Sequence, residues 1–143
     1  MPSGTASDVV VAGNAGALPD ATVRRAVRHV LRRERRAARV AVTFVGKGAM
    51  RRLNATYLRH DRPTDVIAFP LVQPDGSVAG DIYVCRYAAA RNARAQRTSV
   101  RIELLRLVVH GTLHVLGFDH PSGRARTRSA MWRAQERHVA GLR

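Results

Sequence analysis

The first third of the chain combines short β-branched runs with a longer segment of helical periodicity. Three valines at residues 9–11 predict a first strand. Between residues 23 and 31 the apolar positions recur every three or four residues, which predicts an amphipathic helix with Asp20 as its N-cap. Residues 40–45 (VAVTFV) are β-branched and aromatic, so they predict a second strand.

After this strand the pattern predicts a short helix and then a pair of strands. Apolar positions within residues 50–57 have helical spacing. Residues 66–72 predict a third strand, and Pro70 places it at the edge of a sheet because proline donates no hydrogen bond to a neighbouring strand. An Asp-Gly pair at residues 75–76 indicates a turn, and residues 81–85 (DIYVC) predict a fourth strand.

The last part of the chain predicts three helices. The first is an Ala/Arg-rich helix over residues 87–97. Thr98 or Ser99 caps the second, which extends to about Leu116, and the third covers residues 126–139. Because the strands are grouped in the first half with helices before and after them, we expect an α+β fold. Its sheet is small, mixed and about four-stranded, and is packed with helices.

Length and charge narrow the class of protein. The 143 residues contain no long linker, so we expect a single domain over residues 1–143. The formal net charge is +15, and Arg supplies nearly all of the positive charge because Lys47 is the only lysine. A genome rich in Arg codons explains Arg over Lys but not the scarcity of acidic residues. A surface that binds phosphate bidentately explains both, so a polyanionic partner is favoured.

The composition also bears on location. Cys85 is the only cysteine, so no intrachain disulfide is possible and a reducing compartment fits. The N-terminal residues lack a basic segment followed by a long apolar one. The most apolar later stretch, residues 104–118, is interrupted by Arg106, His110 and His114, which argues against a membrane span. We expect a cytoplasmic protein without membrane contact.

Three histidines at the end of that stretch have the spacing of metal ligands. On a helix, His110 and His114 lie on one face, about 5–6 Å apart at Cβ, so their imidazoles reach one ion. Gly117 allows the chain to turn back and bring His120 round as a third ligand. Three protein ligands leave the fourth tetrahedral position open, which is typical of catalytic zinc. We expect one Zn2+ per chain, although nickel, copper and iron also accept imidazole ligands.

The other histidines and the acidic residue beside the motif need separate interpretation. Asp119 either accepts a hydrogen bond from a ligand imidazole or only caps the turn. His29, His60 and His138 lack ligand spacing, so we interpret them as ordinary histidines. These four residues are therefore not counted among the metal ligands.

The residue directly after the first histidine distinguishes peptide hydrolysis from phosphodiester cleavage. The spacing matches the metzincin protease signature H-E-x-x-H-x-x-G-x-x-H, but Gly111 stands where such a protease has its general-base Glu. A peptidase without that carboxylate lacks the group that activates water and protonates the leaving amine. Phosphodiester cleavage makes less rigid demands, because zinc stabilises the phosphoryl charge and supplies hydroxide while Arg offsets negative charge.

Residues 110–120 (HGTLHVLGFDH) resemble the H-G-x-L-H-x-x-G-[YF]-D-H signature of the YbeY family, bacterial rRNA maturation factors regarded as zinc-dependent endoribonucleases. A second block, residues 53–69, resembles the family's L-N-x-x-Y-R-x-x-D-x-P-T-D-V-L-S-F-P. Gly80-Asp81-Ile82 resembles its G-D-I strand start, and Glu103 precedes the zinc helix where the family often has Glu.

The resemblance implies an α+β fold, the three histidines as zinc ligands and cleavage of single-stranded RNA. Its implied role is late-stage 16S rRNA maturation at the 3′ end and ribosome quality control, with rRNA precursor and the small ribosomal subunit as partners. One departure concerns the family's Y-R pair, which is Tyr57-Leu58 here, with Arg59 one position later. Arg59 is therefore either a candidate catalytic contact to phosphate or an exposed loop cation.

Three further residues are more readily explained as structural. Asp65 precedes a predicted strand, where a carboxylate can accept hydrogen bonds from backbone donors in a turn. Asp81 begins the fourth predicted strand. Met131 lies in the last predicted helix, where methionine is more often a core residue than a packing partner of a metal site.

Two other classes of protein remain open besides the endoribonuclease. A non-catalytic RNA-binding ribosome-assembly factor with a structural zinc accounts for the +15 charge equally well. It differs in the fourth zinc position, which a protein side chain fills in a structural site and water in a catalytic one. A metallopeptidase requires a carboxylate from elsewhere in place of Gly111. Whether water or the RNA 2′-hydroxyl attacks is also left open.

Overall fold

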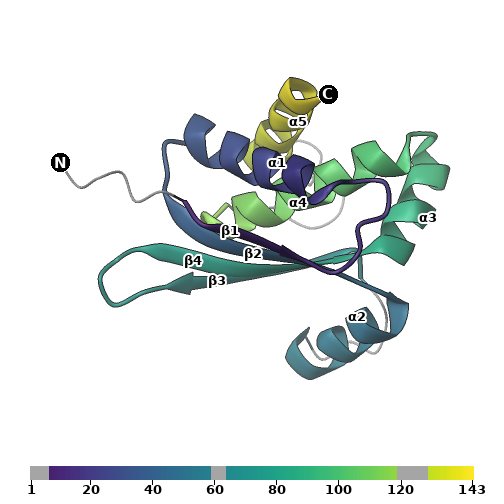
Figure 1. The fold of residues 1–143 in the computed structure, drawn as a ribbon, viewed down its shortest axis with the longest axis horizontal. Coiled ribbons are helices and arrows are strands. Elements are labelled where there is room, and N and C mark those ends of the chain that lie inside the picture. Colours follow the sequence, from purple (N-terminus) through teal and green to yellow (C-terminus); the bar gives the residue numbers. More distant parts are fainter. Residues whose placement is uncertain (1–6, 59–63, 119–128) are drawn as a thin grey trace.

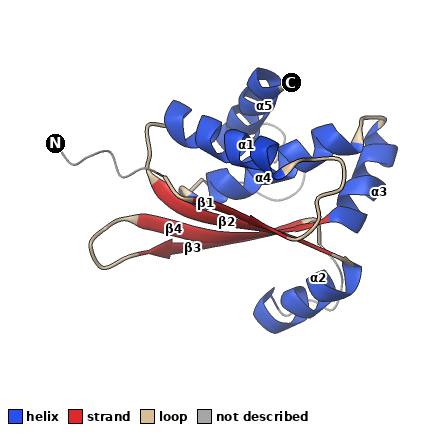
Figure 2. Ribbon diagram, in the orientation of Figure 1, coloured by secondary structure: helices blue, strands red, loops and turns tan. Residues whose placement is uncertain are grey.

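The computed structural model describes residues 7–58, 64–118 and 129–143. Within them the chain forms a four-stranded sheet whose main helical layer covers one face (Figure 1; Figure 2). The elements, in chain order, are β1 (Val9–Ala12), α1 (Asp20–Arg33), β2 (Ala38–Val45), α2 (Lys47–Leu53), the π-helical turn η1 (Asn54–Leu58), β3 (Val66–Val72), β4 (Val78–Cys85), α3 (Arg86–Gln96), α4 (Val100–Val115) and α5 (Ala130–Leu142). The expected α+β fold is confirmed.

The sheet is mixed, as the sequence predicts. Its strand order is β1-β2-β4-β3, with β1 parallel to β2 and β2 parallel to β4. β3 runs antiparallel to β4, and Val72 pairs with Val78 next to the turn. β3 is an edge strand, which confirms the position inferred from Pro70 and explains how a residue without an N–H is accommodated.

Helix α4 lies at the centre of the molecule. It packs against α1, α3 and α5 and also against β3 and β4. Most of its residues are buried, including Leu104, Val108 and Leu113, which join the main hydrophobic core between the sheet and the helical layer. Helix α2 lies on the other side of the sheet, next to a smaller core that contains Met50 and Ile67 (Figure 1). The predicted metal-binding helix is therefore held from several sides.

Two glycines let α4 approach strand β4 closely. A Cβ added to Gly80 would lie 2.4 Å from a methyl carbon of Val115, and one added to Gly111 would lie 2.6 Å from Cγ2 of Ile82. Such contacts are closer than real carbon atoms tolerate, and both neighbours are stiff β-branched side chains. The glycine of the G-D-I segment and the glycine between the first two histidines are thus both required by the packing of one helix on one strand.

Several element ends differ from the sequence-based expectation. The N-cap of α1 is Pro19, with ψ of 149°, and Asp20 is the first helical residue, so the prediction of Asp20 as N-cap was wrong. Asp20 still contributes there, because a negative charge in the first turn interacts favourably with the helix dipole. The last helix begins at Ala130, after Ser129 as N-cap, whereas residue 126, where the sequence predicts its start, lies outside the described residues.

Other ends agree more closely with expectation. Ser99 is the N-cap of α4, and its side chain accepts a hydrogen bond from the Ile102 N–H at 3.1 Å. Met131 is 1% exposed within the main core, as expected.

Among the described residues, no helix combines the length and apolarity needed to cross a bilayer.

Candidate active site

Helix α4 brings His110 and His114 side by side. Their ring centroids are 4.7 Å apart and the ring planes are inclined by 72°. Both residues are partly buried, near the C-terminal end of a helix whose other residues are mostly buried. The four-residue spacing therefore has the consequence predicted for it: the two imidazoles are neighbours on one face.

The helix ends where the sequence predicts. Gly117 has φ of +98°, a left-handed conformation that glycine adopts at low cost. Its N–H donates to the His114 carbonyl at 3.0 Å, and the Phe118 N–H donates to the Leu113 carbonyl at 3.0 Å. This paired pattern is a Schellman motif, which satisfies the last helical carbonyls and turns the chain away from the helix axis.

Three of the predicted site residues lie outside the described residues. They are His120 and Asp119, within residues 119–128, and Arg59, within residues 59–63. Among residues 7–58, 64–118 and 129–143, no three His, Cys, Asp or Glu side chains are arranged to hold a metal ion. The three-histidine ligand set, the role of Asp119 and the role of Arg59 therefore stay predictions.

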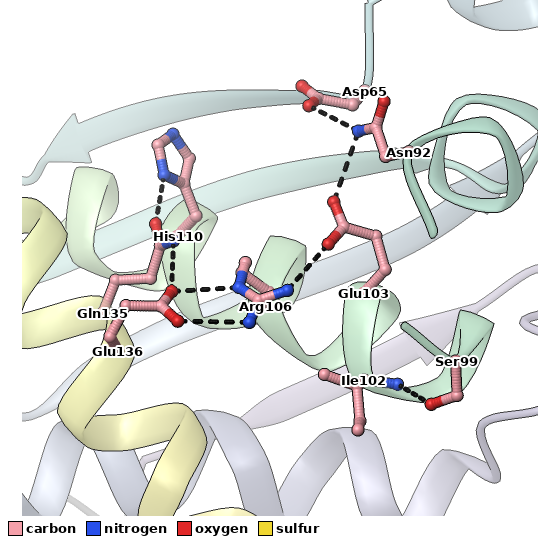
Figure 3. Close-up of polar contacts among 9 residues, drawn as sticks. All are labelled: Asp65, Asn92, Ser99, Ile102, Glu103, Arg106, His110, Gln135 and Glu136. Atoms are coloured by element: carbon pink, nitrogen blue, oxygen red, sulfur yellow. Dashed lines mark hydrogen bonds and ion pairs between the residues drawn. The ribbon is translucent and has the colours of Figure 1, made fainter. Parts of the chain in front are cut away.

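Helix α5 contributes a polar partner to the first histidine. Nδ1 of His110 lies 2.7 Å from Oε1 of Gln135, whose residue is only 2% exposed. Nε2 of Gln135 donates to Oε2 of Glu136 at 3.0 Å. In Figure 3 this series of contacts connects α5 with the neighbouring turn of α4. Sequence reasoning missed both residues of α5.

The contacts continue along α4 through an arginine. Arg106 donates from Nε and Nη2 to Glu136, at 2.9 and 3.1 Å, and from Nη1 to Glu103 at 3.0 Å. The hydrogen bonds to Glu136 are the largest influence on Arg106 and raise its pKa, against the opposing effect of burial. The guanidinium is thus a permanent positive charge matched by two carboxylates.

Asn92 of α3 extends the network to Asp65, the residue before strand β3. Its Nδ2 atom donates to Oε2 of Glu103 at 3.3 Å and to Oδ2 of Asp65 at 3.2 Å (Figure 3). The side chain of Asp65, interpreted from the sequence as a turn residue, therefore takes part in an interaction between two elements. Glu103 is 3% exposed, so its two partners stabilise a charge that burial alone would penalise.

With the exception of Glu136, these side chains line a cavity of about 350 Å³. His110 and His114 line it together with Asp65, Arg106 and Trp132. Its lining is mixed in polarity, because aliphatic residues of β3 and α4 alternate with the charged groups. A pocket of this size with a few convergent polar groups is the kind of site in which ligands bind.

Two histidines outside the motif make contacts between helices. Nε2 of His138, a residue 6% exposed, lies 2.7 Å from Oε2 of Glu34. The rings of His29 and His138 meet edge to face, 5.5 Å apart, where α1 and α5 approach each other. These two histidines belong to the packing of the helical layer, in agreement with the interpretation from their spacing, while His60 lies outside the described residues.

His29 should make the fold sensitive to mild acid. Burial lowers the pKa of His29 below its ordinary value of 6.5, and the charges of His138 and Arg33 lower it further. Folding therefore favours the neutral ring, so this contribution to the free energy of unfolding is complete above pH 6.5 and is lost as the pH falls through the folded pKa. We expect urea denaturation to show decreasing stability below about pH 6.5, with a shallower decrease in His29→Gln. An unchanged slope in that variant would contradict this origin.

The fold and the cleft together define a class of protein. It is a small α+β protein in which one central helix presents adjacent imidazoles and a buried charge network to a cleft of mixed polarity. The chain matches the family model described as Endoribonuclease YbeY over residues 14–143. The protein therefore belongs to the YbeY family of endoribonucleases.

Individual relatives agree with the family model. The chain is 41% identical to Endoribonuclease YbeY of Chlorobium luteolum over 103 residues, covering 71% of this chain and 74% of the relative. It is 39% identical to that of Alkalilimnicola ehrlichii over 140 residues, covering 93% and 83%. A solution structure of a Thermotoga maritima protein superposes with a TM-score of 0.66 at 30% identity, covering 94% of this chain and 88% of that one.

Proposed function

We propose that this protein is a zinc-dependent endoribonuclease for single-stranded RNA, acting in the cytoplasm in late-stage 16S rRNA 3′-end maturation and ribosome quality control. The observation that carries the proposal is the pair of adjacent imidazoles, His110 and His114, on the wall of a polar cavity. Family membership supports RNA as the substrate. The net charge of +15 supports a polyanionic partner, and residues 1–143 are proposed as one catalytic domain.

The residues in the cavity fit a zinc ion. His110 and His114 offer imidazole nitrogens, which zinc accepts as ligands, from positions where their rings already touch. His120 is the proposed third ligand, and Asp119 is the proposed hydrogen-bond partner of a ligand ring. When bound, zinc supplies a Lewis acid beside the scissile phosphate.

Phosphate binding needs a guanidinium other than Arg106. That side chain donates to Glu103 and Glu136, so its charge is already matched within the cavity wall. Arg59 therefore remains the proposed contact to the phosphate, where a fixed positive charge offsets the charge that develops during cleavage.

The position of Gly111 supports a nuclease over a metallopeptidase. A Cβ at this residue would point at Ile82 of strand β4, at 2.6 Å, on the face of α4 that packs against the sheet. A Glu at this position would therefore enter the hydrophobic core. The described part of α4 offers a protease-type base no room at the position where metzincins carry it.

The fluorescence of Trp132 offers a test of RNA binding in the cavity. It is the only tryptophan of the chain, it is partly buried, and it lines the cavity beside the two histidines. Stacking of a base on an aromatic side chain contributes about 1–3 kcal/mol. We expect single-stranded RNA to change the Trp132 emission, and Trp132→Leu to weaken binding about tenfold or more while Trp132→Phe retains most of it. Unchanged emission at saturating RNA would place the bases elsewhere.

The proposed activity is tested with protein of known metal content. Protein stripped of metal by a chelator is compared with the same protein after addition of one equivalent of zinc. Each is incubated with an rRNA precursor that spans the 3′ end of 16S rRNA, and with fully double-stranded RNA of the same sequence. We expect zinc-dependent cleavage of the single-stranded regions, with defined ends. Zinc-loaded protein that binds this RNA tightly without cutting it would instead support the RNA-binding assembly factor.

A further inference from the structure

The side chain of Gln135 meets the first predicted metal ligand from a different helix. Its Oε1 atom lies 2.7 Å from Nδ1 of His110, a short and well-defined hydrogen bond between α5 and α4. Because Gln135 is 2% exposed, water does not compete for this contact. A buried amide next to an imidazole has one of two orientations, which present either oxygen or nitrogen to the ring.

The neighbouring carboxylate selects one of these orientations. Glu136 lies 3.0 Å from the other end of the Gln135 amide, and both of its oxygens accept hydrogen bonds from Arg106. Burial is the largest single influence on Glu136 and raises its pKa, but the hydrogen bonds from Arg106 and Gln135, together with the charges of Arg106 and Arg143, leave the pKa lowered. An ionised carboxylate accepts only, so the amide must turn its N–H group toward Glu136.

The orientation of the amide in turn selects a tautomer of the imidazole. With nitrogen toward Glu136, the Gln135 oxygen faces His110 and accepts only. Nδ1 of His110 must then carry a hydrogen, which excludes the tautomer protonated at Nε2 alone. The neutral ring consequently has its lone pair on Nε2, and in Figure 3 this ring nitrogen points away from Gln135.

We propose that Gln135 is a positioning residue that holds His110 in the Nδ1–H tautomer and so makes Nε2 the metal-binding nitrogen. Glu136 and Arg106 act one step further away, because they fix the amide that fixes the ring. The metal-binding part of this inference rests on the proposed function, whereas the tautomer is a property of the chain itself. Conventional zinc sites use a carboxylate or a carbonyl in this role, and the Gln135 amide oxygen is equivalent to the latter.

The first test reads the tautomer in the metal-free protein. Long-range 1H–15N correlation spectra of 15N-histidine-labelled protein distinguish the two neutral tautomers, and the signals of His110 are identified from their loss in His110→Gln. We expect the Nδ1–H pattern in the wild type and a shift toward Nε2–H in Gln135→Met, which keeps a similar shape without an acceptor. A wild-type His110 with its hydrogen on Nε2 would overturn the proposal whether or not the protein cleaves RNA.

The second test measures zinc affinity by competition with a chromophoric chelator. Loss of such an orienting partner typically weakens a metal site about 10–100-fold, and we expect that loss for Gln135→Met. Gln96→Met is the matched control, because Gln96 also lines the cavity but is exposed on α3. The control should retain both the affinity and the tautomer. Equal zinc affinity in Gln135→Met and wild type, with a native thermal transition in both, would contradict the proposal, while a wild type that binds no zinc would contradict the proposed function alone.

Discussion

His114→Ala should abolish RNA cleavage and leave the fold intact. The side chain is partly buried in the cavity wall beside His110, so its removal takes away one proposed metal ligand without opening the main core. Loss of the electrostatic stabilisation that the proposed metal would provide should lower the cleavage rate by about a thousandfold or more, roughly 4 kcal/mol in barrier height. Bound zinc should fall in parallel, as measured by metal analysis after dialysis.

A histidine outside the cavity provides the control for this variant. His29 contacts His138 where α1 meets α5 and does not line the cavity. At pH 7.5 or so, where its ring is already neutral, His29→Gln should cleave RNA and bind zinc as the wild type does. Wild-type cleavage by metal-free His114→Ala would refute the proposed mechanism, and cleavage lost with zinc retained would leave His114 a role in catalysis but not in metal binding.

Gly111→Glu should unfold the protein instead of converting it into a peptidase. The first atom of the new side chain would already lie 2.6 Å from Ile82, and the carboxylate beyond it would enter the core between α4 and β4. Overpacking costs about 1–3 kcal/mol, and burial of an unpaired polar or charged group adds several more. The total is comparable to the whole stability of a typical domain, about 5–15 kcal/mol. We expect loss of the cooperative thermal transition.

The same substitution at an exposed glycine tests whether the loss of stability comes from the added charge or from the position of the residue. Gly48 lies exposed in α2, where an added Cβ would only touch the end of Arg52 at 3.5 Å. Glu in place of Gly48 is four residues before that arginine, so Gly48→Glu should be neutral or slightly stabilising. A folded, zinc-loaded Gly111→Glu that hydrolyses casein would revive the metallopeptidase.

Local patterns were sufficient to predict the kinds of elements but not all of their ends. Strand β2 starts at Ala38 and β4 at Val78, before the apolar runs that identify them, because pairing in the sheet extends a strand beyond its most β-branched residues. The N-cap of α1 is Pro19 and not Asp20, because the fixed φ of proline suits the extended N-cap conformation. This cap makes no side-chain hydrogen bond. Such choices depend on neighbours distant in sequence.

The candidate site could be predicted in part for a related reason. Four polar residues form a stripe on the otherwise apolar helix α4, and their helical spacing can be recognised in the sequence. They are Glu103, Arg106, His110 and His114. This spacing indicates that one face of α4 meets polar partners. The stripe does not tell which residues these partners are. Gln135 and Asn92 lie on other helices and reach the stripe only through the tertiary packing of α5 and α3. Spacing identifies candidate ligands on one helix but not the residues of other helices that contact them.

The contribution of α5 to the cavity has a consequence for the order in which the protein is made. The histidine motif is synthesised before Trp132 and Gln135, both of which come from this later helix. A nascent chain that ends before α5 therefore carries the proposed ligands without the amide that contacts His110. Because chains emerge from the ribosome N-terminus first, the cavity that His110 and His114 line stays incomplete on the ribosome that is making it until α5 has docked.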